Sequence, residues 1–263
     1  MLDAISHLTT FLVEPSSSQA RYIETQLEEF GLQNVHRFAS GKEALAAARV
    51  SKPDVVISAL YLPDGSGAEL FAELRALDEE IALILISSET QRHALEAIRQ
   101  LGVCAIVPKP FTHEQLSAAL RATRDFLRRD EDFAGELDVE ELRVLLVDDS
   151  ATARRYMRQV LDNLGIERVV EAADGAQGLA LLADTMFDLV ITDYNMPTMD
   201  GKAFTELIRQ QSWQRSVPIL MVTSEADQGR LSAVQEAGVS AICDKPFEPA
   251  TVKRLLAALL AGH

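Results

Sequence analysis

Residues 187–193 read Phe-Asp-Leu-Val-Ile-Thr-Asp, and residues 53–59 read Pro-Asp-Val-Val-Ile-Ser-Ala. Each stretch is a short run of β-branched and aliphatic residues behind an aspartate, which is typical of a buried strand. The two stretches lie 134 residues apart, as positions 54 and 188 show. This repetition indicates a duplicated domain, and the rest of the sequence is interpreted from it.

Three further pairs of segments match in the same order along the chain: 11–16 with 145–150, 84–89 with 220–225, and 107–111 with 243–247. The separation changes by only two residues between the third and fourth matches, where a loop or helix end can absorb the difference. We therefore expect one domain at 1–129 and a second at 143–263.

Short apolar runs alternate with amphipathic stretches in each copy. In the second copy the pattern predicts strands at 143–148, 168–172, 188–193, 217–223 and 239–244. Helical patterns lie between them, near 150–164, 175–186, 201–211, 226–238 and 247–261. The first copy repeats this order from about 9 to 129. Five βα units in each copy predict an α/β fold, with two tandem parallel sheets that are covered by helices on both faces.

The two copies are joined by residues 130–142, which contain seven acidic residues and no basic one. This composition favours a solvated linker. The alternative is that Phe133 and Leu137 dock between the domains and set their relative orientation.

Charge and composition exclude several classes of protein. The chain has 25 Lys and Arg against 40 Asp and Glu, a net charge of −15, whereas binding to nucleic acid needs a basic face. Two cysteines cannot form a disulfide framework. The chain has no apolar run long enough for a membrane helix and no signal-peptide pattern at its N-terminus. We expect a cytoplasmic protein that contacts neither nucleic acid nor membrane.

Polar residues end the predicted strands of the second copy. Asp148 and Asp149 end the first strand, Asp193 the third, Thr223 the fourth and Lys245 the fifth. Ligands bind at this edge of an open α/β sheet. Three carboxylates in one place repel one another unless a cation binds, and Mg²⁺ prefers such oxygen ligands. With a lysine for an anionic group and a hydroxyl donor, the set indicates phosphoryl transfer to an aspartate.

Four motifs of the second copy resemble the receiver domain of two-component response regulators: Val147-Asp148-Asp149-Ser150, Thr192-Asp193-Tyr194-Asn195-Met196-Pro197 with Asp200-Gly201, Val222-Thr223-Ser224, and Asp244-Lys245-Pro246-Phe247. The resemblance implies flavodoxin-like doubly wound domains with strand order 2-1-3-4-5. It also implies that Asp193 is the phosphoacceptor. Asp148 and Asp149 would hold Mg²⁺ together with the backbone carbonyl of Asn195. Thr223 would hydrogen-bond to the acyl phosphate, and Lys245, which would precede a cis proline, would pair with the phosphoryl group.

The resemblance further implies a signalling protein rather than an enzyme. A histidine kinase or phosphotransfer protein would supply the phosphoryl group, and slow self-dephosphorylation would remove it. The output would be altered contact with a downstream protein or output domain, or contact between receivers within the chain or in a homodimer. One departure is Ile242, with Ile106 in the first copy, where receivers usually carry Tyr or Phe. We expect Ile242 to be a core residue.

The corresponding positions of the first copy read Glu14, Pro15, Ala59, Ser87 and Lys109. Alanine has no nucleophilic atom, and proline removes a carboxylate and a backbone N–H. We expect a pseudo-receiver that cannot be phosphorylated, in which Lys109 pairs with Glu14. An interaction or regulatory role is favoured over a spacer, or over a site for another anion near Ser87 and Lys109.

Three arginines of the second copy, Arg154, Arg155 and Arg158, follow the acidic pair on one predicted helix. We expect a solvated face, which would also be open to a partner. Two other functions remain open for the whole chain. It could be the regulatory part of a signalling enzyme, such as a diguanylate cyclase or a phosphatase, whose output domain is missing from this chain. It could also be a phosphate sink or scaffold that does not switch.

Overall fold

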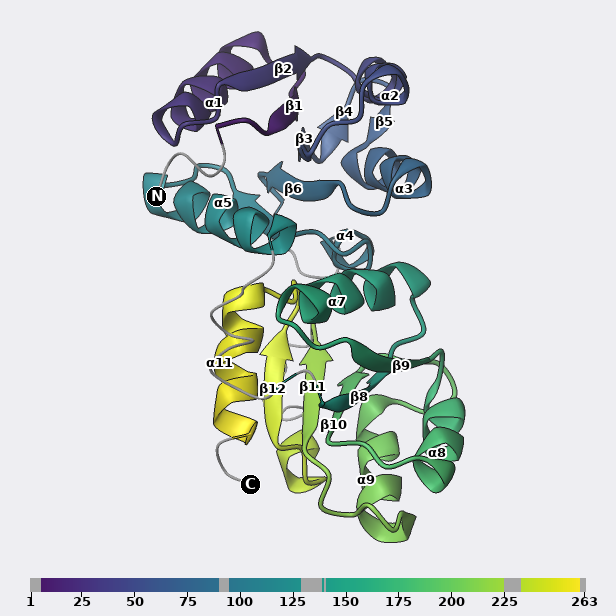
Figure 1. The fold of residues 1–263 in the computed structure, drawn as a ribbon. Helices are drawn as coiled ribbons and strands as arrows, with labels where there is room; N and C mark the ends of the chain where they lie inside the picture. Colours follow the sequence, from purple (N-terminus) through teal and green to yellow (C-terminus); the bar gives the residue numbers. More distant parts are fainter. Residues whose placement is uncertain (1–5, 90–94, 129–138, 140, 225–232, 261–263) are drawn as a thin grey trace. The chain divides into compact units, whose positions relative to one another are not determined.

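The computed structural model describes residues 6–89, 95–128, 139, 141–224 and 233–260. The chain divides into two compact units, 1–128 and 129–263. Figure 1 shows the α/β architecture of each unit. The expected linker at 130–142, with Phe133 and Leu137, lies almost wholly outside the described residues. Among the helices that are described, none combines the length and apolar character needed to cross a membrane.

The first unit contains a five-stranded parallel sheet in the order β2-β1-β3-β6-β7. Its strands are β1 (Thr9–Val13), β2 (Asn34–Phe38), β3 (Val55–Ala59), β6 (Ala82–Ser87) and β7 (Ala105–Pro108). Its helices are α1 (Ser17–Glu29), α2 (Gly41–Val50), α3 (Gly67–Leu77), α4 (Glu96–Arg99) and α5 (His113–Leu127). The side chains of α2, α3 and α4 share one core with the sheet, while α1 and α5 cover the other face (Figure 1).

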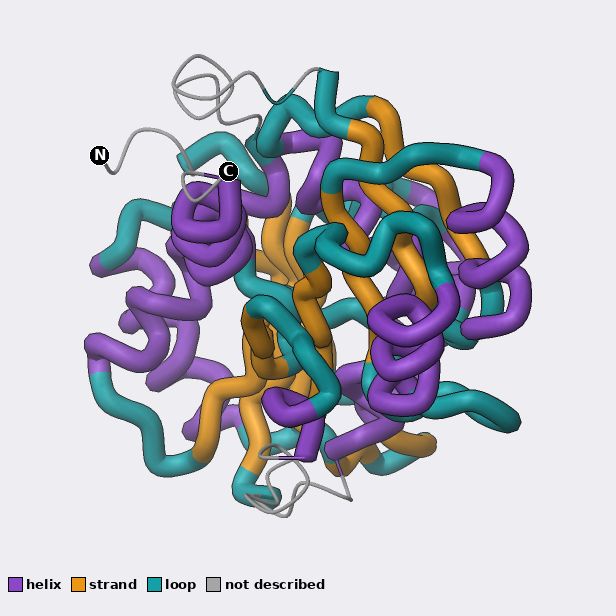
Figure 2. Tube along the Cα trace, turned by 90° about the horizontal axis from the view of Figure 1, so that it is seen from below, coloured by secondary structure: helices purple, strands orange, loops and turns teal. Residues whose placement is uncertain are grey.

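The second unit repeats this design, with the strand order β12-β11-β10-β8-β9. Its strands are β8 (Arg143–Val147), β9 (Arg168–Ala172), β10 (Leu189–Asp193), β11 (Ile219–Thr223) and β12 (Ala241–Asp244). Its helices are α7 (Ala151–Asn163), α8 (Gly175–Asp184), α9 (Gly201–Gln211) and α11 (Pro249–Leu260). Numbered along each unit, leaving out the short β4 and β5, both sheets have the order 2-1-3-4-5, as expected. The strands form the middle layer, between helices, in the tube view of Figure 2.

Several expected boundaries of the second unit move inward by one or two residues. The fourth strand begins at Ile219 because Pro218 has no N–H to donate to a neighbouring strand. The last helix begins at Pro249, a residue that favours the first helical position. The fifth strand begins at Ala241. Of the helix expected at 226–238, residues 233–236 are helical and 225–232 lie outside the described part.

A short hairpin in the first unit was not expected. Strands β4 (Tyr61–Leu62) and β5 (Gly65–Ser66) pair antiparallel between β3 and α3. The sequence Pro63-Asp64-Gly65 is a common turn, since proline presets φ and Asp and Gly tolerate the bend. In the second unit, no strand is assigned in the corresponding loop, between Asp193 and Gly201.

Polar caps begin the helices directly after the strands. Ser16 and Ser150 cap α1 and α7, and each side chain accepts a hydrogen bond from the helix backbone. Gly165 follows α7 and Gly238 follows residues 233–236, and both have positive φ, as expected for helix C-termini. The helices are thereby held close to the carboxyl ends of the strands.

One glycine in each unit permits a helix to approach a strand end closely. A Cβ added to Gly67 would lie 2.5 Å from the Ala59 carbonyl oxygen, and one added to Gly201 would lie 2.3 Å from the Asp193 carbonyl oxygen. Both contacts are shorter than any tolerable approach of a methyl group. The N-terminus of α9 therefore packs directly against the backbone of Asp193.

We expect Gly67→Ala to lower the free energy of unfolding of the first unit by about 1–3 kcal/mol, because the methyl group must displace backbone. Gly41→Ala is the matched control at the start of α2. Its Cβ would first meet the Leu62 side chain, at 3.2 Å. Hydrogen exchange of the full chain in increasing urea resolves the two units. Equal destabilisation by both substitutions would contradict the argument from close approach.

Candidate functional site

Three carboxylates meet at the carboxyl edge of the second sheet. Asp148 directly follows β8 and Asp193 ends β10, and these two strands are paired. One oxygen from each of Asp148, Asp149 and Asp193 lies within 4.8 Å of the others. Asp148 and Asp193 are buried, whereas Asp149 is exposed. The parallel strands thus bring together residues that are far apart in the sequence.

A lysine reaches this cluster from the last strand. Lys245 follows β12, and its Nζ lies 3.1 Å from Asp148 Oδ2 and 3.1 Å from Asp193 Oδ1. Its backbone N–H donates to the carbonyl of Thr223, and the Lys245–Pro246 peptide is cis, as expected. The Lys245 side chain is 4% exposed, so its ammonium group is committed to the two carboxylates.

The other two expected site residues lie on neighbouring segments. Thr223 ends β11, is buried, and lies between the strand of Asp193 and the strand that precedes Lys245. Asn195 is exposed, two residues beyond Asp193 in the loop that leads to α9. The structure therefore brings Asp148, Asp149, Asp193 and Lys245 together and places Thr223 and Asn195 on adjoining segments of the same edge.

Burial dominates the electrostatics of the cluster. It raises the pKa of Asp193 to about 6, with a further increase from Asp148 that Lys245 opposes. Burial also raises the pKa of Asp148. For Lys245, burial alone would lower the pKa, but the two carboxylates outweigh it and the pKa is raised. Burial thus disfavours the state in which Asp148, Asp193 and Lys245 are all charged, and favours a state in which one of the two carboxyl groups is protonated.

Asp193 differs from its neighbours in its hydrogen bonding. Asp148 Oδ1 accepts from the Ser150 backbone N–H at 2.8 Å, and Lys245 donates to Asp148 Oδ2. Both oxygens of Asp193 are buried and neither accepts a well-formed hydrogen bond, although Lys245 Nζ lies 3.1 Å from Oδ1 as an ion pair. A buried carboxylate in this state has unused acceptor capacity.

The oxygen donors of this cluster fit a hard divalent cation. Asp148, Asp149 and Asp193 offer carboxylate oxygens, and the exposed side of the site leaves room for the waters that Mg²⁺ retains. Among the described residues, this is the one group of three acidic, histidine or cysteine side chains close enough to share a metal ion.

The corresponding edge of the first unit has a different network. Lys109 Nζ lies 2.6 Å from Glu14 Oε2 and 2.7 Å from Gln19 Oε1. The other oxygen of Glu14 accepts from the Ser16 backbone N–H at 3.0 Å. The pairing of Lys109 with Glu14 is confirmed, and the contribution of Gln19 is new. Ala59 ends β3, and Ser87 ends β6. Here both carboxylate oxygens are satisfied by the protein itself.

Arg154 is a component of the second site that the sequence did not reveal. Its Nη1 donates to the backbone carbonyl of Asp148 at 2.6 Å, and its Nε donates to Glu171 at 3.2 Å. Its side chain is only 16% exposed, so the expected solvated face is wrong for this residue. The matching residue of the first unit is Ala20, which is a signal that the internal comparison could have given.

Ile242 on β12, which we expected in the core, is only half-buried. Its counterpart Ile106 on β7 is also half-buried and packs against the core of the first unit. Arg158 also departs from the solvated arrangement, because it donates to Asp162 and to the backbone of β9.

We expect Asp193→Asn to stabilise the metal-free second unit at neutral pH. Because the folded pKa lies above the ordinary value of 3.8, this carboxyl group favours folding at low pH, and the benefit is lost as pH rises from about 4 to about 6. The variant should gain about 3 kcal/mol well above pH 6 and little at pH 4. Urea unfolding in EDTA, followed by the fluorescence of Trp213, measures this.

Asp149→Asn, which removes the exposed carboxylate of the same cluster, is the control and should stabilise the metal-free unit less than Asp193→Asn does. Saturating Mg²⁺ should reverse the order, because it binds the charged site of the parent protein. A metal-free Asp193→Asn protein that is less stable than the parent at pH 7.5 would contradict the burial argument.

Arg154→Ala should weaken Mg²⁺ binding about tenfold, the size of effect that outer-shell partners of metal ligands often have. Simple loss of a positive charge near the site would instead tighten Mg²⁺ binding. The direction of the change in affinity therefore distinguishes a positioning role of Arg154 from an effect of its charge. Arg155→Ala, exposed on the same helix, removes an equal charge and serves as the control. Calorimetric Mg²⁺ titration gives the two affinities, and tighter binding by the Arg154 variant would refute the positioning role.

Comparison with known proteins identifies the repeated domain. The sequence model described as "Response regulator receiver domain" matches residues 10–121 and 144–257. Chemotaxis protein CheY-3 of Vibrio cholerae is 38% identical over 117 residues, which are 44% of this chain and 90% of that protein. Chemotaxis protein CheY of Pseudomonas aeruginosa is 36% identical over 112 residues, 43% of this chain and 90% of that protein.

The solved structure of chemotaxis response regulator CheY4 of Vibrio cholerae is also similar, with 36% identity and a TM-score of 0.42. The matched region is 45% of this chain and 98% of the CheY4 chain. The two matched segments of the family model take up most of the chain. The chain belongs to the response regulator receiver family and carries two receiver domains in tandem.

Proposed function

We propose that the second receiver accepts a phosphoryl group on Asp193 from a histidine kinase or phosphotransfer protein. The observation that carries this proposal is the buried Asp193 carboxylate, whose two oxygens have no hydrogen bond although acidic and basic groups surround them. A carboxylate that must act as a nucleophile needs an oxygen that is not already committed to the protein.

In the proposed reaction, one carboxylate oxygen of Asp193 attacks the phosphorus of a phosphohistidine. A P–O bond forms as the P–N bond breaks, and the electron pair of that bond returns to the imidazole. Asp193 must be ionised to attack. Burial raises its pKa to about 6 in the metal-free protein, and bound Mg²⁺ would lower that pKa and favour the ionised form. Mg²⁺, held by Asp148, Asp149, Asp193 and the backbone carbonyl of Asn195, would neutralise charge on the phosphoryl oxygens.

Two further site residues, Lys245 and Thr223, would bind the phosphoryl group once it is on Asp193. Lys245, held between Asp148 and Asp193, is positioned to pair with a phosphoryl oxygen as a point charge. Thr223 supplies a hydroxyl donor at the adjoining strand end. Their engagement would shift an equilibrium between two conformations and so alter protein contacts. Water attacking the same phosphorus would end the signal slowly.

For the first receiver we propose a regulatory or interaction role without phosphorylation. Ala59 provides no nucleophile, and Pro15 replaces a carboxylate. Lys109 is already bound by Glu14 and Gln19, so this network is complete without metal or phosphate. Contacts of this domain with the second receiver, with another copy or with a downstream protein would be its contribution.

The remaining assignments stay predictions from the sequence. They are a first domain at 1–129, an acidic linker at 130–142, a second domain at 143–263, and a cytoplasmic location.

Radiolabelled acetyl phosphate with Mg²⁺ tests the site assignment. We expect the full chain to gain a base-labile label, as an acyl phosphate should, and we expect Asp193→Asn or EDTA to abolish it. Ala59→Asp added to the Asp193→Asn protein is the control, and it should remain unlabelled because Glu14 and Gln19 hold Lys109 and Pro15 stands where the second receiver has the carboxylate of Asp149. Label retained on Asp193→Asn would refute the assignment.

A further inference from the structure

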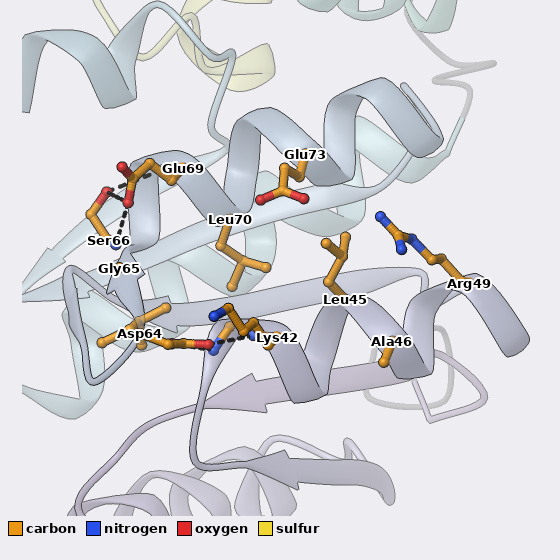
Figure 3. A pocket seen from close by; sticks show the side chains of 12 residues that line it. Lys42, Leu45, Ala46, Arg49, Asp64, Gly65, Ser66, Glu69, Leu70 and Glu73 are labelled. Carbon is orange, nitrogen blue, oxygen red and sulfur yellow. Dashed lines mark hydrogen bonds between the residues drawn. The ribbon is translucent and has the colours of Figure 1, made fainter.

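The first receiver carries a cavity of about 520 Å³ between α2, α3 and the β4–β5 hairpin (Figure 3). Its two walls are the facing sides of the helices, and residues of the hairpin close one end. The apolar part of its lining consists of Leu45, Leu62 and Leu70 with Ala46. This cavity takes no part in the proposed phosphoryl chemistry.

The two walls carry opposite charge. Lys42 and Arg49 stand on α2, and Glu69 and Glu73 stand on α3. Figure 3 shows Arg49 and Glu73 directed toward the space between the helices. Glu69 is partly engaged by the cap of its own helix, where it accepts from Ser66. The result is a basic wall and an acidic wall on either side of an apolar floor, with the carboxylate of Asp64 held by the backbone N–H groups of Gly41 and Lys42 at the hairpin end.

The charges at the far end of the groove are not neutralised by the protein. Within the described part of the chain, the guanidinium of Arg49 and the carboxylate of Glu73 form no hydrogen bond or ion pair, with each other or with another residue. Both side chains are exposed. Each is therefore available to a partner that offers the complementary group.

Exposed apolar side chains lie at the same end. Val50, the last residue of α2, is 90% exposed, and Leu77, the last residue of α3, is 43% exposed. Leu77 is one helical turn beyond Glu73, on the same side of α3. An occupant that lay along the groove could cover these side chains and remove their apolar surface from water.

The second receiver has uncharged side chains at the corresponding positions. Ala176 and Ala183 replace Lys42 and Arg49, and Ala203 and Leu207 replace Glu69 and Glu73. Phe204 replaces Leu70, and its ring lies 2.9 Å from where a Cβ on Gly178 would be.

Trp213 donates its indole N–H to the carbonyl of Ala183 at the far end of α8. The charged groove therefore belongs to the receiver that lacks the phosphoacceptor.

We propose that this groove is the docking site for an amphipathic helix of a partner protein. The occupant would place an apolar ridge between α2 and α3, acidic residues toward Lys42 and Arg49, and basic residues toward Glu69 and Glu73. A helix fits because the charges on each wall repeat at one- or two-turn intervals, which a third helix lying alongside can match. This assigns a binding surface to the first receiver and does not depend on phosphorylation of the second.

Three synthetic peptides of about 18 residues, constrained as helices because short free helices are marginal in water, are the probes. All share one leucine ridge. The mixed peptide has Glu on one flank and Lys on the other, and the two reference peptides have Lys or Glu on both flanks. We expect the full chain to bind the mixed peptide about fivefold more tightly than either reference, which is the combined effect of a few exposed ion pairs. Fluorescence anisotropy measures the affinities.

A charge reversal on one wall makes the test specific. Lys42→Glu with Arg49→Glu turns both walls acidic at exposed positions, so preference should move to the peptide with Lys on both flanks. Arg21→Glu with Arg121→Glu makes the same change in net charge on α1 and α5, at the opposite face of the first sheet, and should leave the preference for the mixed peptide unchanged. Hydrogen exchange should show protection by the peptide at 41–50 and 61–77.

Equal binding of the three peptides, binding of none, protection elsewhere, or an unchanged preference in the Lys42 and Arg49 variant would each overturn the docking site. Loss of phosphorylation in the Asp193 variants would leave all of these outcomes unaffected, so the two proposals fail independently.

Discussion

The structure of the second receiver depends on how two buried carboxylates are kept at the end of a parallel sheet. Asp148 and Asp193 lie on paired strands with almost no exposure, and charged groups in such a place are unfavourable unless they are compensated. Lys245 provides part of the compensation from the last strand. The remainder is left to a cation. Under the proposed function, this incomplete compensation is what would make Asp193 reactive.

The lysine at the end of the last strand has different partners in the two receivers. In the second, Lys245 lies between two carboxylates, and the oxygens of Asp193 stay without a hydrogen bond. In the first, Glu14 is one methylene longer than aspartate and, with Gln19, binds Lys109 at 2.6 and 2.7 Å. The fold does not require the acidic cluster, because the same strand order and helix caps form in both units. Under our proposals, the two receivers therefore use different surfaces of the same fold.

Most of the fold could be predicted because it follows from local patterns. Apolar runs, polar caps such as Ser150 and the repeated segments place strands and helices to within a few residues. The β4–β5 hairpin was missed, although Pro63-Asp64-Gly65 is a turn signal, since two-residue strands have no periodicity to detect. The strand order was predicted from the family resemblance, because the pattern of apolar segments along the chain does not show which strands pair with each other.

The sequence by itself determined that the chain is a duplication, that one copy has three aspartates and a lysine at strand ends, and that the other lacks the nucleophile. These conclusions need only residue identity and spacing. Only the tertiary structure decided that Arg154 holds the backbone of Asp148, that Gln19 shares Lys109, and that Arg49 and Glu73 face one groove without pairing. Each of these arrangements depends on where the terminal atoms of a long side chain lie in space. Their neighbours are backbone carbonyls or residues distant in the sequence, and no sequence pattern predicts such contacts.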